Sequence, residues 1–538
     1  MPTVIIGLLR WPMMTEHNQD HQSTQPTVAA KELLHAIEIL EKIVDDRGLL
    51  LPLEKEDRDR LVRAASRISH PGRAARRQVQ KAHRMQQREA QEKRKAMDEQ
   101  LLATTGIRTH FSVRQLKAPT PPEPFETPTA PAGDHPDAHF KGELNEARNC
   151  YICKQDYRRL HFFYDSMCPD CAEFNWKKRN QTADLSGRYA LLTGGRVKIG
   201  FHAALKLLQA GAHVVVTTRF PRDATERFLQ QEDSHLWQDR LQVHGLDLRH
   251  TPSVEAFASH LCDTLPRLDF ILNNACQTVR RPPGYYQHLM DHENVQSDSL
   301  PLEAKQLLAS HEELLGNRQV STPNVPLPVE VSGALAGIQR AAELSQIPLA
   351  PGDTTYGHET FPAGHYDADL QQVDLRTINS WRLKLSEVPT VELLEVQLVN
   401  AVAPFVLNAR LKPLMLQSKN RDKHIVNVSA MEGVFYRAYK RDTHPHTNMA
   451  KAALNMMTRT SALDYVRDGI HMNSVDTGWI TDEDPAEIAK RKKEELQFHT
   501  PLDQIDAAAR ICDPIFDGLL TGKHTWGKFL KDYQVANW

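Results

Sequence analysis

Long hydrophobic runs are missing from this sequence: it has no stretch of about eighteen apolar residues, so we expect no transmembrane helix. A large net charge is missing too. The formal charge is −2 over 538 residues, which argues against a globally basic nucleic-acid-binding protein. Cysteine is scarce, with seven residues, and four of them lie in one short segment. This distribution favours a reducing, cytoplasmic compartment and one metal site over a disulfide framework.

The chain is too long for one ordinary hydrophobic core, so we expect several units. Apolar residues at helical spacing over residues 28–46 predict an amphipathic helix, and residues 1–112 as a whole should form a helical, basic N-terminal region. Seven prolines between residues 117 and 138 predict a semi-rigid extended linker, which we place at residues 113–145.

Residues 73–95 are dense in arginine, lysine and glutamine and poor in apolar residues. Such a stretch is usually an exposed, solvated helix, and we favour that interpretation. The alternative is an arm that binds a nucleic acid or an acidic protein partner. The cations of this segment include Arg73, Arg76, Arg77, Lys81, Arg84 and Arg88.

Two Cys-x2-Cys pairs, with fourteen residues between them, lie within residues 146–180. Each pair directs two thiolates at one point, and two pairs complete the tetrahedron that Zn²⁺ prefers. We therefore predict a zinc knuckle with a closed, structural site; reduced cysteines, disulfides or a redox role are the alternatives. Because only a short stretch precedes the next predicted strand, the knuckle should pack against the domain that follows. The expected ligands are Cys150, Cys153, Cys168 and Cys171.

Residues 187–220 consist of an apolar strand, a glycine-rich turn, an amphipathic helix and a second apolar strand. This order is that of the βαβ unit that holds a pyrophosphate. Gly194 and Gly195 let the backbone approach the phosphates, and the helix that starts near Ile199 offers its N-terminal amides to them. We therefore predict a doubly wound, parallel, Rossmann-type α/β domain.

The end of the second strand chooses between the two nicotinamide cofactors. An acidic residue there would bind the ribose diol and repel a 2′-phosphate. This chain has Thr218 and Arg219 instead, and Arg196 and Lys198 lie in the facing loop. Three cations that converge on the adenosine ribose favour NADP(H) over NAD(H) through charge-assisted hydrogen bonds.

Several segments are similar to those of the short-chain dehydrogenase/reductase family. Asn427-Val-Ser-Ala and Thr447-Asn-Met-Ala-Lys resemble its active-site segments, and Asn273-Asn-Ala resembles the end of its fourth strand. The resemblance covers roughly residues 187–275 and 390–485.

This resemblance implies one NADP(H)-binding domain over residues 185–538, with a large insertion at residues 277–389. An insertion at that point would lie by the carboxyl edge of the sheet, where substrates bind. A lid is one interpretation of it, and an oligomer contact or a solvated excursion is the other.

By position, the resemblance also implies which residues contact the cofactor. The family's Asp that contacts adenine corresponds to Asp247, its strand-end Asn to Asn274, and Thr481 lies near its carboxamide-binding Thr. The expected cofactor-binding residues are Thr193, Gly194, Gly195, Arg196, Lys198, Ile199, Gly200, Thr218, Arg219, Asp247, Leu248, Asn274, Ala275, Lys451, Gly478 and Thr481.

The family's catalytic groups are only partly present. Where the family has Ser and Tyr, this chain has Ala430 and Thr447, whereas Asn400 and Lys451 match the family's Asn and Lys. An aliphatic hydroxyl has a far higher pKa than a phenol, so Thr447 cannot inherit the proton transfer of the tyrosine. The acid/base groups are therefore either relocated or lost. The expected catalytic candidates are Lys451, Asn400, Ser429, Tyr436, Tyr439 and His446.

Together these features predict an NADP(H)-dependent oxidoreductase of this family that acts on a carbonyl or an alcohol with a rearranged acid/base site. The alternative is a catalytically inactive relative that binds NADP(H) as a sensor or scaffold. We expect a homo-oligomer, and the substrate stays open.

Overall fold

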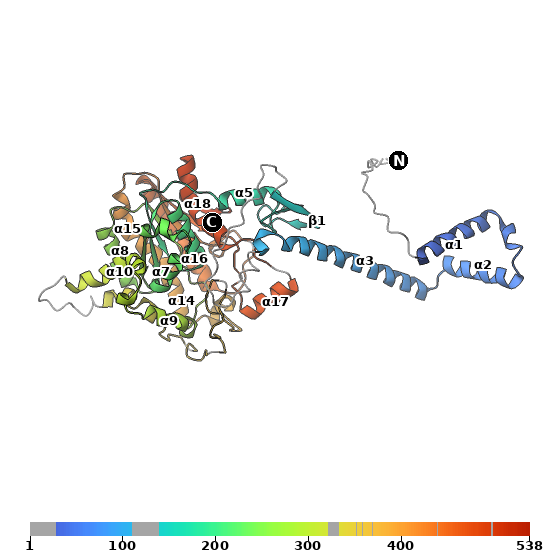
Figure 1. The fold of residues 1–538 in the computed structure, drawn as a ribbon, viewed down its shortest axis with the longest axis horizontal. Helices are drawn as coiled ribbons and strands as arrows, with labels where there is room; N and C mark the ends of the chain where they lie inside the picture. The colour runs from blue at the N-terminus through green and yellow to red at the C-terminus, as the bar shows by residue number, and fades with distance from the viewer. Residues whose placement is uncertain are drawn as a thin grey trace, which may run out of the picture. The chain divides into compact units, whose positions relative to one another are not determined.

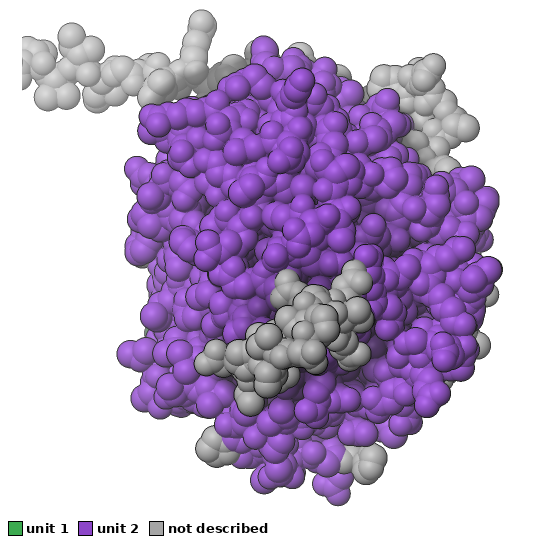
Figure 2. Space-filling view, turned by 90° about the vertical axis from the view of Figure 1, so that its left-hand side faces the viewer, with its two compact units in different colours: residues 1–92 green, residues 93–538 purple. Residues whose placement is uncertain are grey.

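The structure is a computed structural model that describes residues 28–109, 139–320 and 333–538, apart from residues 351, 358, 368, 438, 482 and 497–498. Most of the predicted proline-rich linker lies outside the described residues. The chain divides into two compact units, residues 1–92 and residues 93–538. Figure 1 shows the elements in chain order, and Figure 2 shows one face of the second unit as a continuous packed surface.

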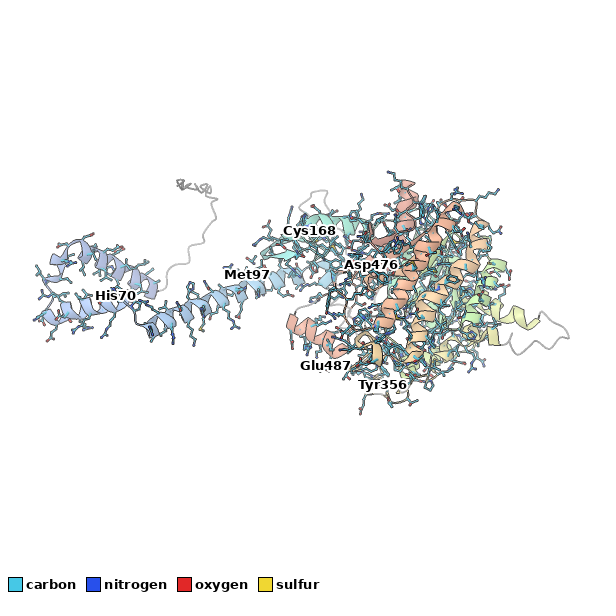
Figure 3. The ribbon with its side chains drawn as sticks, turned by 180° about the vertical axis from the view of Figure 1, so that it is seen from behind. His70, Met97, Cys168, Tyr356, Asp476 and Glu487 are labelled. Carbon is cyan, nitrogen blue, oxygen red and sulfur yellow. The ribbon has the colours of Figure 1, made fainter. Side chains whose placement is uncertain are left out.

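The first unit is helical, as the sequence predicts. It contains α1 (Val28–Asp45), the short helix η1 (Arg47–Leu50), α2 (Lys55–Ser69) and the first part of α3 (Arg73–Ala103). No described side chain of η1 or α2 is buried, and α3 buries only Asp98 and Leu102 near its end. The predicted solvated helix is therefore present, and Figure 3 shows its side chains projecting outward between the labels His70 and Met97.

The cysteine-containing segment forms a small unit of an antiparallel hairpin and a helix: β1 (Phe140–Asn149), β2 (Asp156–His161) and α5 (Pro169–Arg179). Strand β1 begins inside residues 113–145, so the end of the predicted linker is wrong. Only one position of β1, Leu144, is buried, where it packs against Leu102 and Leu160. The side chains of β1 alternate between exposed and at least partly buried, but Phe140 and Leu144 are the only large apolar ones on the inner side, so the sequence did not reveal the strand.

The main sheet has eight strands in the order β10-β9-β8-β7-β6-β3-β4-β5, and every pair is parallel except β10 with β9. The chain order reverses beside β3, which creates the switch point where α/β sheets bind ligands. The predicted doubly wound parallel fold is confirmed. The strands are β3 (Tyr189–Thr193), β4 (His213–Thr218), β5 (Leu241–Gly245), β6 (Phe270–Asn273), β7 (Lys423–Ser429), β8 (Ile470–Asp476), β9 (Phe529–Lys531) and β10 (Gln534–Ala536).

Helices cover both faces of this sheet. One face packs against α6 (Lys198–Gln209) and α18 (Gln504–Thr521), and the other against α8 (Thr251–Thr264), α15 (Ala403–Leu416) and α16 (Pro445–Arg467). The strands are buried on both faces, as a parallel sheet requires. This double burial explains the apolar runs Ala190–Leu192 of β3 and Val214–Val216 of β4 in the sequence, whereas β7 and β8 also bury polar side chains such as Asn427 and Asn473.

One continuous helical run, Thr390–Leu416, is long and apolar enough to cross a membrane by length and composition. Polar and charged residues such as Glu395, Asn400 and Arg410 interrupt this run, so it is not a stretch of eighteen apolar residues, and the expectation of no transmembrane helix stays a prediction. The run consists of α14 (Thr390–Gln397), a π-helical turn (Leu398–Val402) and α15. Half of its most apolar window is buried inside the protein, and α15 packs against α8 in the core, as the central helix of a folded domain does.

The described part of the insertion is packed against the sheet edge. Its α10 (Leu302–Val320) lies against β5, and its Tyr285 and Tyr286 form a buried cluster with Phe220, which follows β4. The remaining helices are α7 (Pro221–Leu229), η3 (Ser234–Leu236), η4 (Gln238–Arg240), η5 (Pro283–Tyr286), α9 (Gln287–Glu293), η6 (Ser297–Ser299), α12 (Ala336–Gln339), α13 (Ala341–Leu344), η7 (Ser380–Arg382), η8 (Leu385–Glu387), η10 (Met431–Gly433) and α17 (Ala486–Leu496).

Candidate functional site: a cleft at the carboxyl ends of the strands

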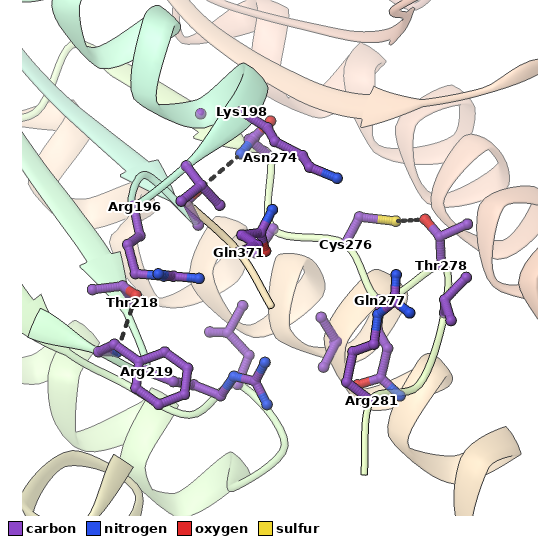
Figure 4. A pocket seen from close by; sticks show the side chains of 18 of the residues that line it. Arg196, Lys198, Thr218, Arg219, Asn274, Cys276, Gln277, Thr278, Arg281 and Gln371 are labelled. Carbon is purple, nitrogen blue, oxygen red and sulfur yellow. Dashed lines mark hydrogen bonds between the residues drawn. The ribbon is translucent and has the colours of Figure 1, made fainter. Parts of the chain in front are cut away.

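A cleft lies at the carboxyl ends of β3, β4, β5 and β6, at the switch point of the sheet. Figure 4 shows Arg196 and Arg219 on one side of it, Cys276 and Thr278 on the other, and Gln371 of the insertion between them. Twelve of the expected cofactor residues line the cleft: Gly194, Arg196, Lys198, Ile199, Gly200, Thr218, Arg219, Asp247, Leu248, Asn274, Ala275 and Thr481.

The glycine-rich turn is shaped by close backbone contacts. Gly194 has a φ of +71°, and a Cβ there would lie 2.8 Å from the Cα of Ala275. A Cβ on Gly200 would lie 2.2 Å from the carbonyl oxygen of Gly194. Asn274 donates from Nδ2 to the carbonyl oxygens of Thr193 (3.0 Å) and Gly194 (3.1 Å), so the ends of β3 and β6 hold each other. The turn therefore has the geometry that the sequence predicts for a pyrophosphate loop.

The end of β4 is cationic and rigid. Arg219 donates from Nη2 to the hydroxyl of Tyr286 at 2.6 Å, and its guanidinium lies 4.6 Å from the Tyr286 ring and 5.6 Å from the Phe220 ring. Arg196 donates to Asp223 at 2.7 Å. Thr218 accepts the backbone N–H of Phe220. Both guanidiniums are thus held in place before any ligand arrives.

Tyr286 shows the strength of this positive field. Burial would raise the pKa of its phenol, but the charges of Arg219, Arg281 and Arg196, with the hydrogen bond from Arg219, outweigh burial and lower the pKa. A cavity that favours a phenolate also favours a phosphate, because both are oxygen anions.

Asp247, the expected adenine contact, is already engaged. Arg249 donates to its carboxylate from the backbone N–H (2.9 Å) and from the guanidinium (2.6 Å). Burial opposes ionisation of Asp247, but these bonds and the charge of Arg249 lower its pKa below the ordinary value. Arg249 also donates to Glu395, which accepts from Arg280 at the start of the insertion. An ion network therefore joins the cleft floor to the insertion.

Sequence reasoning missed Tyr286, Glu395, Arg249 and Gln371, which line the cleft. The positions of Tyr286 and Gln371 depend on how the insertion folds back over β4, and no local pattern encodes that. The pair Asp247-x-Arg249 offered the one readable signal, since an acid and a base two residues apart can pair.

The two residues that match the family's Asn and Lys are bound within the protein. Asn400 lies in the π-helical turn, accepts the backbone N–H of Gln277 (2.8 Å) and donates to its carbonyl oxygen (3.2 Å). Lys451 is buried and donates from Nζ to the carbonyl oxygen of Val428 at 2.7 Å. Both therefore brace the segments that border the cleft.

The other catalytic candidates do not line the cleft. Ser429 is buried and donates to Asn455 at 2.7 Å. Tyr436 and Tyr439 are 47% and 75% exposed. His446 is buried, with its Nε2 3.4 Å from Glu392 Oε1, and the structure does not gather these four side chains at one point.

Thr447, at the position of the family's tyrosine, is buried, and its hydroxyl has no hydrogen-bond partner among the described residues.

The end of β8 contributes a glycine and a buried carboxylate. Gly478, with a φ of +79°, lies two residues after Asp476, the last residue of the strand. Burial raises the pKa of Asp476 to about 6, against the opposing charge of Lys531 and the backbone N–H of Met431. Sequence reasoning did not single out Asp476.

The four predicted cysteine ligands are brought together. Their sulfur atoms all lie within 4.8 Å of one another, and the Sγ atoms of Cys153 and Cys168 are 3.6 Å apart. A tetrahedral zinc with Zn–S bonds of about 2.3 Å separates its sulfurs by about 3.8 Å, so the arrangement fits that ion.

A second group of possible ligands, His139, His161 and Glu173, does not fit a metal as well. The backbone N–H groups of Phe163 and Tyr164 both point at Nδ1 of His161, at 3.1 and 3.3 Å. Nδ1 must then be the acceptor, so Nε2 carries the proton and has no lone pair to offer a metal.

The cysteine unit packs against the main domain, as expected. Arg179 makes a two-pronged ion pair with Asp503, at 2.7 and 2.9 Å, with both side chains fully buried. The hydroxyl of Tyr151, which lies between two cysteines, accepts the backbone N–H of Trp479 at 3.0 Å. Trp479 follows Gly478 and precedes the cleft residue Ile480. The turn between Cys150 and Cys153 is therefore one hydrogen bond from the cleft wall.

Two family models match the chain: short chain dehydrogenase over residues 188–295, and enoyl-(acyl carrier protein) reductase over residues 379–512. Together they flank the insertion. Among curated proteins, the uncharacterized protein R665 of Acanthamoeba polyphaga mimivirus is 29% identical over 70% of this chain and 73% of its own length. The dehydrogenase/reductase SDR family member 13 of Bos taurus is 36% identical over 106 residues, which span 19% of this chain and 27% of that protein.

Solved structures of similar fold include a Pseudomonas aeruginosa RhlG/NADP active-site complex, 17% identical, covering 65% of this chain and 95% of that one with a TM-score of 0.40. The NADPH-bound carbonyl reductase from chicken fatty liver is also 17% identical, covering 66% and 100%, with a TM-score of 0.37. The two family matches, which overlap the two ends of the insertion, and the doubly wound sheet make this chain similar to the short-chain dehydrogenase/reductase family.

Proposed function

We propose that this protein is an NADP(H)-dependent oxidoreductase that acts on a carbonyl or an alcohol. The observation that carries the proposal is the end of β4, where Arg196 and Arg219 line the cleft and Thr218 stands in place of an acidic residue. Guanidiniums that are already fixed by Asp223 and Tyr286 lose little freedom on binding a phosphate.

The bound nicotinamide would supply hydride chemistry. The chain itself must then orient the cofactor, exclude water and move one proton. Among the candidates, His446 immediately precedes Thr447, and its Nε2 lies 3.4 Å from Oε1 of Glu392. Neither ring nitrogen of His446 has a hydrogen-bond partner among the described residues. Histidine is the most frequent proton donor in enzymes. In this proposal His446 provides the proton, and Lys451 holds β7 through the carbonyl oxygen of Val428.

One observation favours a second candidate, a relative that binds NADP(H) without turnover. Lys451 donates to Val428, and Ser429, Tyr436, Tyr439 and His446 are absent from the lining of the cleft. Such a protein would bind NADP(H) at the end of β4 and act as a sensor or scaffold.

Binding is tested first, by isothermal titration of the full chain with NADPH and with NADH. We expect NADPH to bind tighter. Arg219→Gln should weaken NADPH binding about 10- to 100-fold, the loss of one or two charge-assisted hydrogen bonds, and leave NADH unchanged. Arg410→Gln, which removes an exposed arginine paired with Glu255, is the matched control. Equal binding of the two cofactors would contradict the proposal.

Turnover separates the two candidates. A panel of carbonyl compounds is screened for NADPH oxidation, and His446→Ala and Lys451→Ala are compared with the unaltered chain. An oxidoreductase loses at least about 100-fold in kcat in the His446 variant while its NADPH affinity is kept. Tight NADPH binding with no oxidation across the panel favours the non-catalytic candidate.

The proposal includes a structural zinc ion held by Cys150, Cys153, Cys168 and Cys171. The fit of the four sulfur atoms to a tetrahedron supports it. Metal analysis should find one zinc per chain, and Cys171→Ser should abolish it and lower the melting temperature. Cys262→Ser, at an exposed cysteine outside the cluster, is the control.

A further inference from the structure

The helices α1, α2 and α3, which we call the helical arm, contain a long segment without a single acidic residue. Between Asp59 and Glu89 the chain has nine arginines and lysines and no aspartate or glutamate. The whole chain has a net charge of −2, so the rest of it is net acidic. The positive charge is therefore concentrated in one place, the second half of α2 and the first half of α3.

These cations are exposed to solvent, and most of them make no ion pair in the described chain. Every arginine and lysine of the segment is exposed. Within the described chain, Arg60 pairs with Asp57 and Arg88 with Glu92, whereas Arg73, Arg77, Lys81 and Arg84 make no ion pair. Neither α2 nor this part of α3 buries a side chain, so the charges do not serve a core.

The cations of α3 also share one face. Steps of three and four residues return to the same side of an α-helix, and such steps separate the members of the stripe. At 1.5 Å per residue the stripe is about 22 Å long. We call it the basic stripe; its members are Arg73, Arg77, Lys81, Arg84 and Arg88.

The kind of partner follows from what accompanies the charge. No Phe, Tyr or Trp occurs between Trp11 and Phe111, so the arm has no ring on which to stack an unpaired base. Protein interfaces place aromatic and apolar anchors at their centre, whereas Val79 and Met85 are the large apolar residues of residues 73–88. Interfaces with nucleic acid duplexes are polar and strongly positive instead.

We propose that α2 and α3 bind double-stranded nucleic acid through its phosphates, without reading sequence. The basic stripe supplies the main contacts, and Arg60, Arg63 and Arg67 of α2 add to them beyond the Pro71-Gly72 turn. This activity is separate from the cofactor cleft, and it holds or fails independently of the oxidoreductase proposal.

The experiment measures fluorescence anisotropy of labelled duplexes of about 20 base pairs with the full chain over a range of salt concentrations. A DNA duplex, an RNA duplex, a single strand and a poly-glutamate peptide are compared. Both duplexes should bind, tighter than the single strand, and the peptide should not. The logarithm of the binding constant should fall with that of salt with a slope of about −4 to −5 if only the five cations of the basic stripe contact phosphates, and of up to about −7 if the three arginines of α2 do so as well.

The charge itself is tested by Arg77→Gln, Lys81→Gln and Arg84→Gln together, since glutamine keeps the helix propensity. Duplex affinity should fall at least about tenfold at about 0.1 M salt, and the slope should become less steep by about 3. The matched control removes three exposed cations elsewhere, Lys490→Gln, Arg491→Gln and Lys523→Gln. It should bind duplex like the unaltered chain.

Circular dichroism of each variant checks that the helices stay folded. The double variant Arg77→Lys and Arg84→Lys keeps the charge and should keep the affinity. The proposal is overturned if the triple glutamine variant binds duplex normally, if the single strand binds tighter than the duplexes, or if none of the nucleic acids binds. Poly-glutamate binding as tight as duplex binding overturns it in favour of an acidic protein partner.

Discussion

The carboxyl ends of β4 and β7 differ in where their polar side chains point. At the β4 end, Arg196 and Arg219 are fixed by Asp223 and Tyr286 and still line the cleft. At the β7 end, Lys451 and Ser429 do not line the cleft and make their hydrogen bonds inside the protein. The same sheet therefore presents fixed cations to the cleft at the end of β4 and satisfied polar groups at the end of β7.

The largest expected effect comes from the glycine-rich turn Gly194–Gly200, which follows β3. Gly200→Val would place side-chain carbons against the carbonyl oxygen of Gly194, which a Cβ alone already approaches to 2.2 Å. We expect NADPH affinity to fall more than about 100-fold, since backbone must move. Titration calorimetry measures it, with melting curves to verify folding. Gly316→Ala, where nothing lies within 4 Å, should change neither; normal affinity in the Gly200 variant would contradict the loop geometry.

Protonation at the β7 end provides the next test. The pKa of Asp476 is about 6 in the folded chain, above its ordinary value of 3.8, so the folded state binds more protons between those values. This carboxyl therefore costs stability above pH 6, and the cost disappears as the pH falls towards 4. Asp476→Asn should remove about 1 kcal/mol of that pH dependence, measured by urea unfolding at pH 8 and pH 5.5. Parallel pH profiles for the two proteins would refute the assignment.

A smaller effect is expected where the insertion meets the β4 end. Tyr286→Phe removes the hydroxyl that accepts from Arg219 but keeps the ring beneath the guanidinium. NADPH affinity should fall about fivefold, the value of one modest hydrogen bond, and NADH affinity should not change. Tyr356→Phe, in the same insertion, is the control. An equal loss for both cofactors would show that Tyr286 acts on the cleft as a whole.

The smallest effect concerns the contact between the turn Cys150–Cys153 and the cleft wall. Tyr151→Phe deprives the Trp479 N–H of its acceptor and should speed amide hydrogen exchange across residues 478–481. NADPH affinity should fall about threefold or less. Zinc content should stay the same, which separates this effect from loss of the metal. Unchanged exchange would mean that the loop after β8 is held by other contacts.

Parts of the site could be predicted because the chemistry is local. The two Cys-x2-Cys pairs, the Gly194–Gly200 turn and the strand-end Arg219 each depend on residues a few positions apart. The end of the linker and the short strands β9 and β10 could not be predicted. Strands of three residues are too short to show a period, and the inner side of β1 carries mostly polar residues and glycine. The catalytic residues could not be assigned from the sequence either, because the assignment depends on which groups Lys451 and Ser429 hydrogen-bond.

The sequence by itself determined the doubly wound sheet, the four-cysteine cluster and the cationic end of β4, because continuous apolar strands, paired cysteines and strand-end residues act over short distances. Only the tertiary structure decided the other contacts. Arg219 donates a hydrogen bond to Tyr286 of the insertion, Arg249 donates to the carboxylate of Asp247, and the backbone N–H of Trp479 donates to Tyr151. Except for the neighbouring pair Asp247 and Arg249, these contacts join residues far apart in the chain. Their formation depends on how the insertion and the cysteine unit pack on the sheet, which local propensity does not encode.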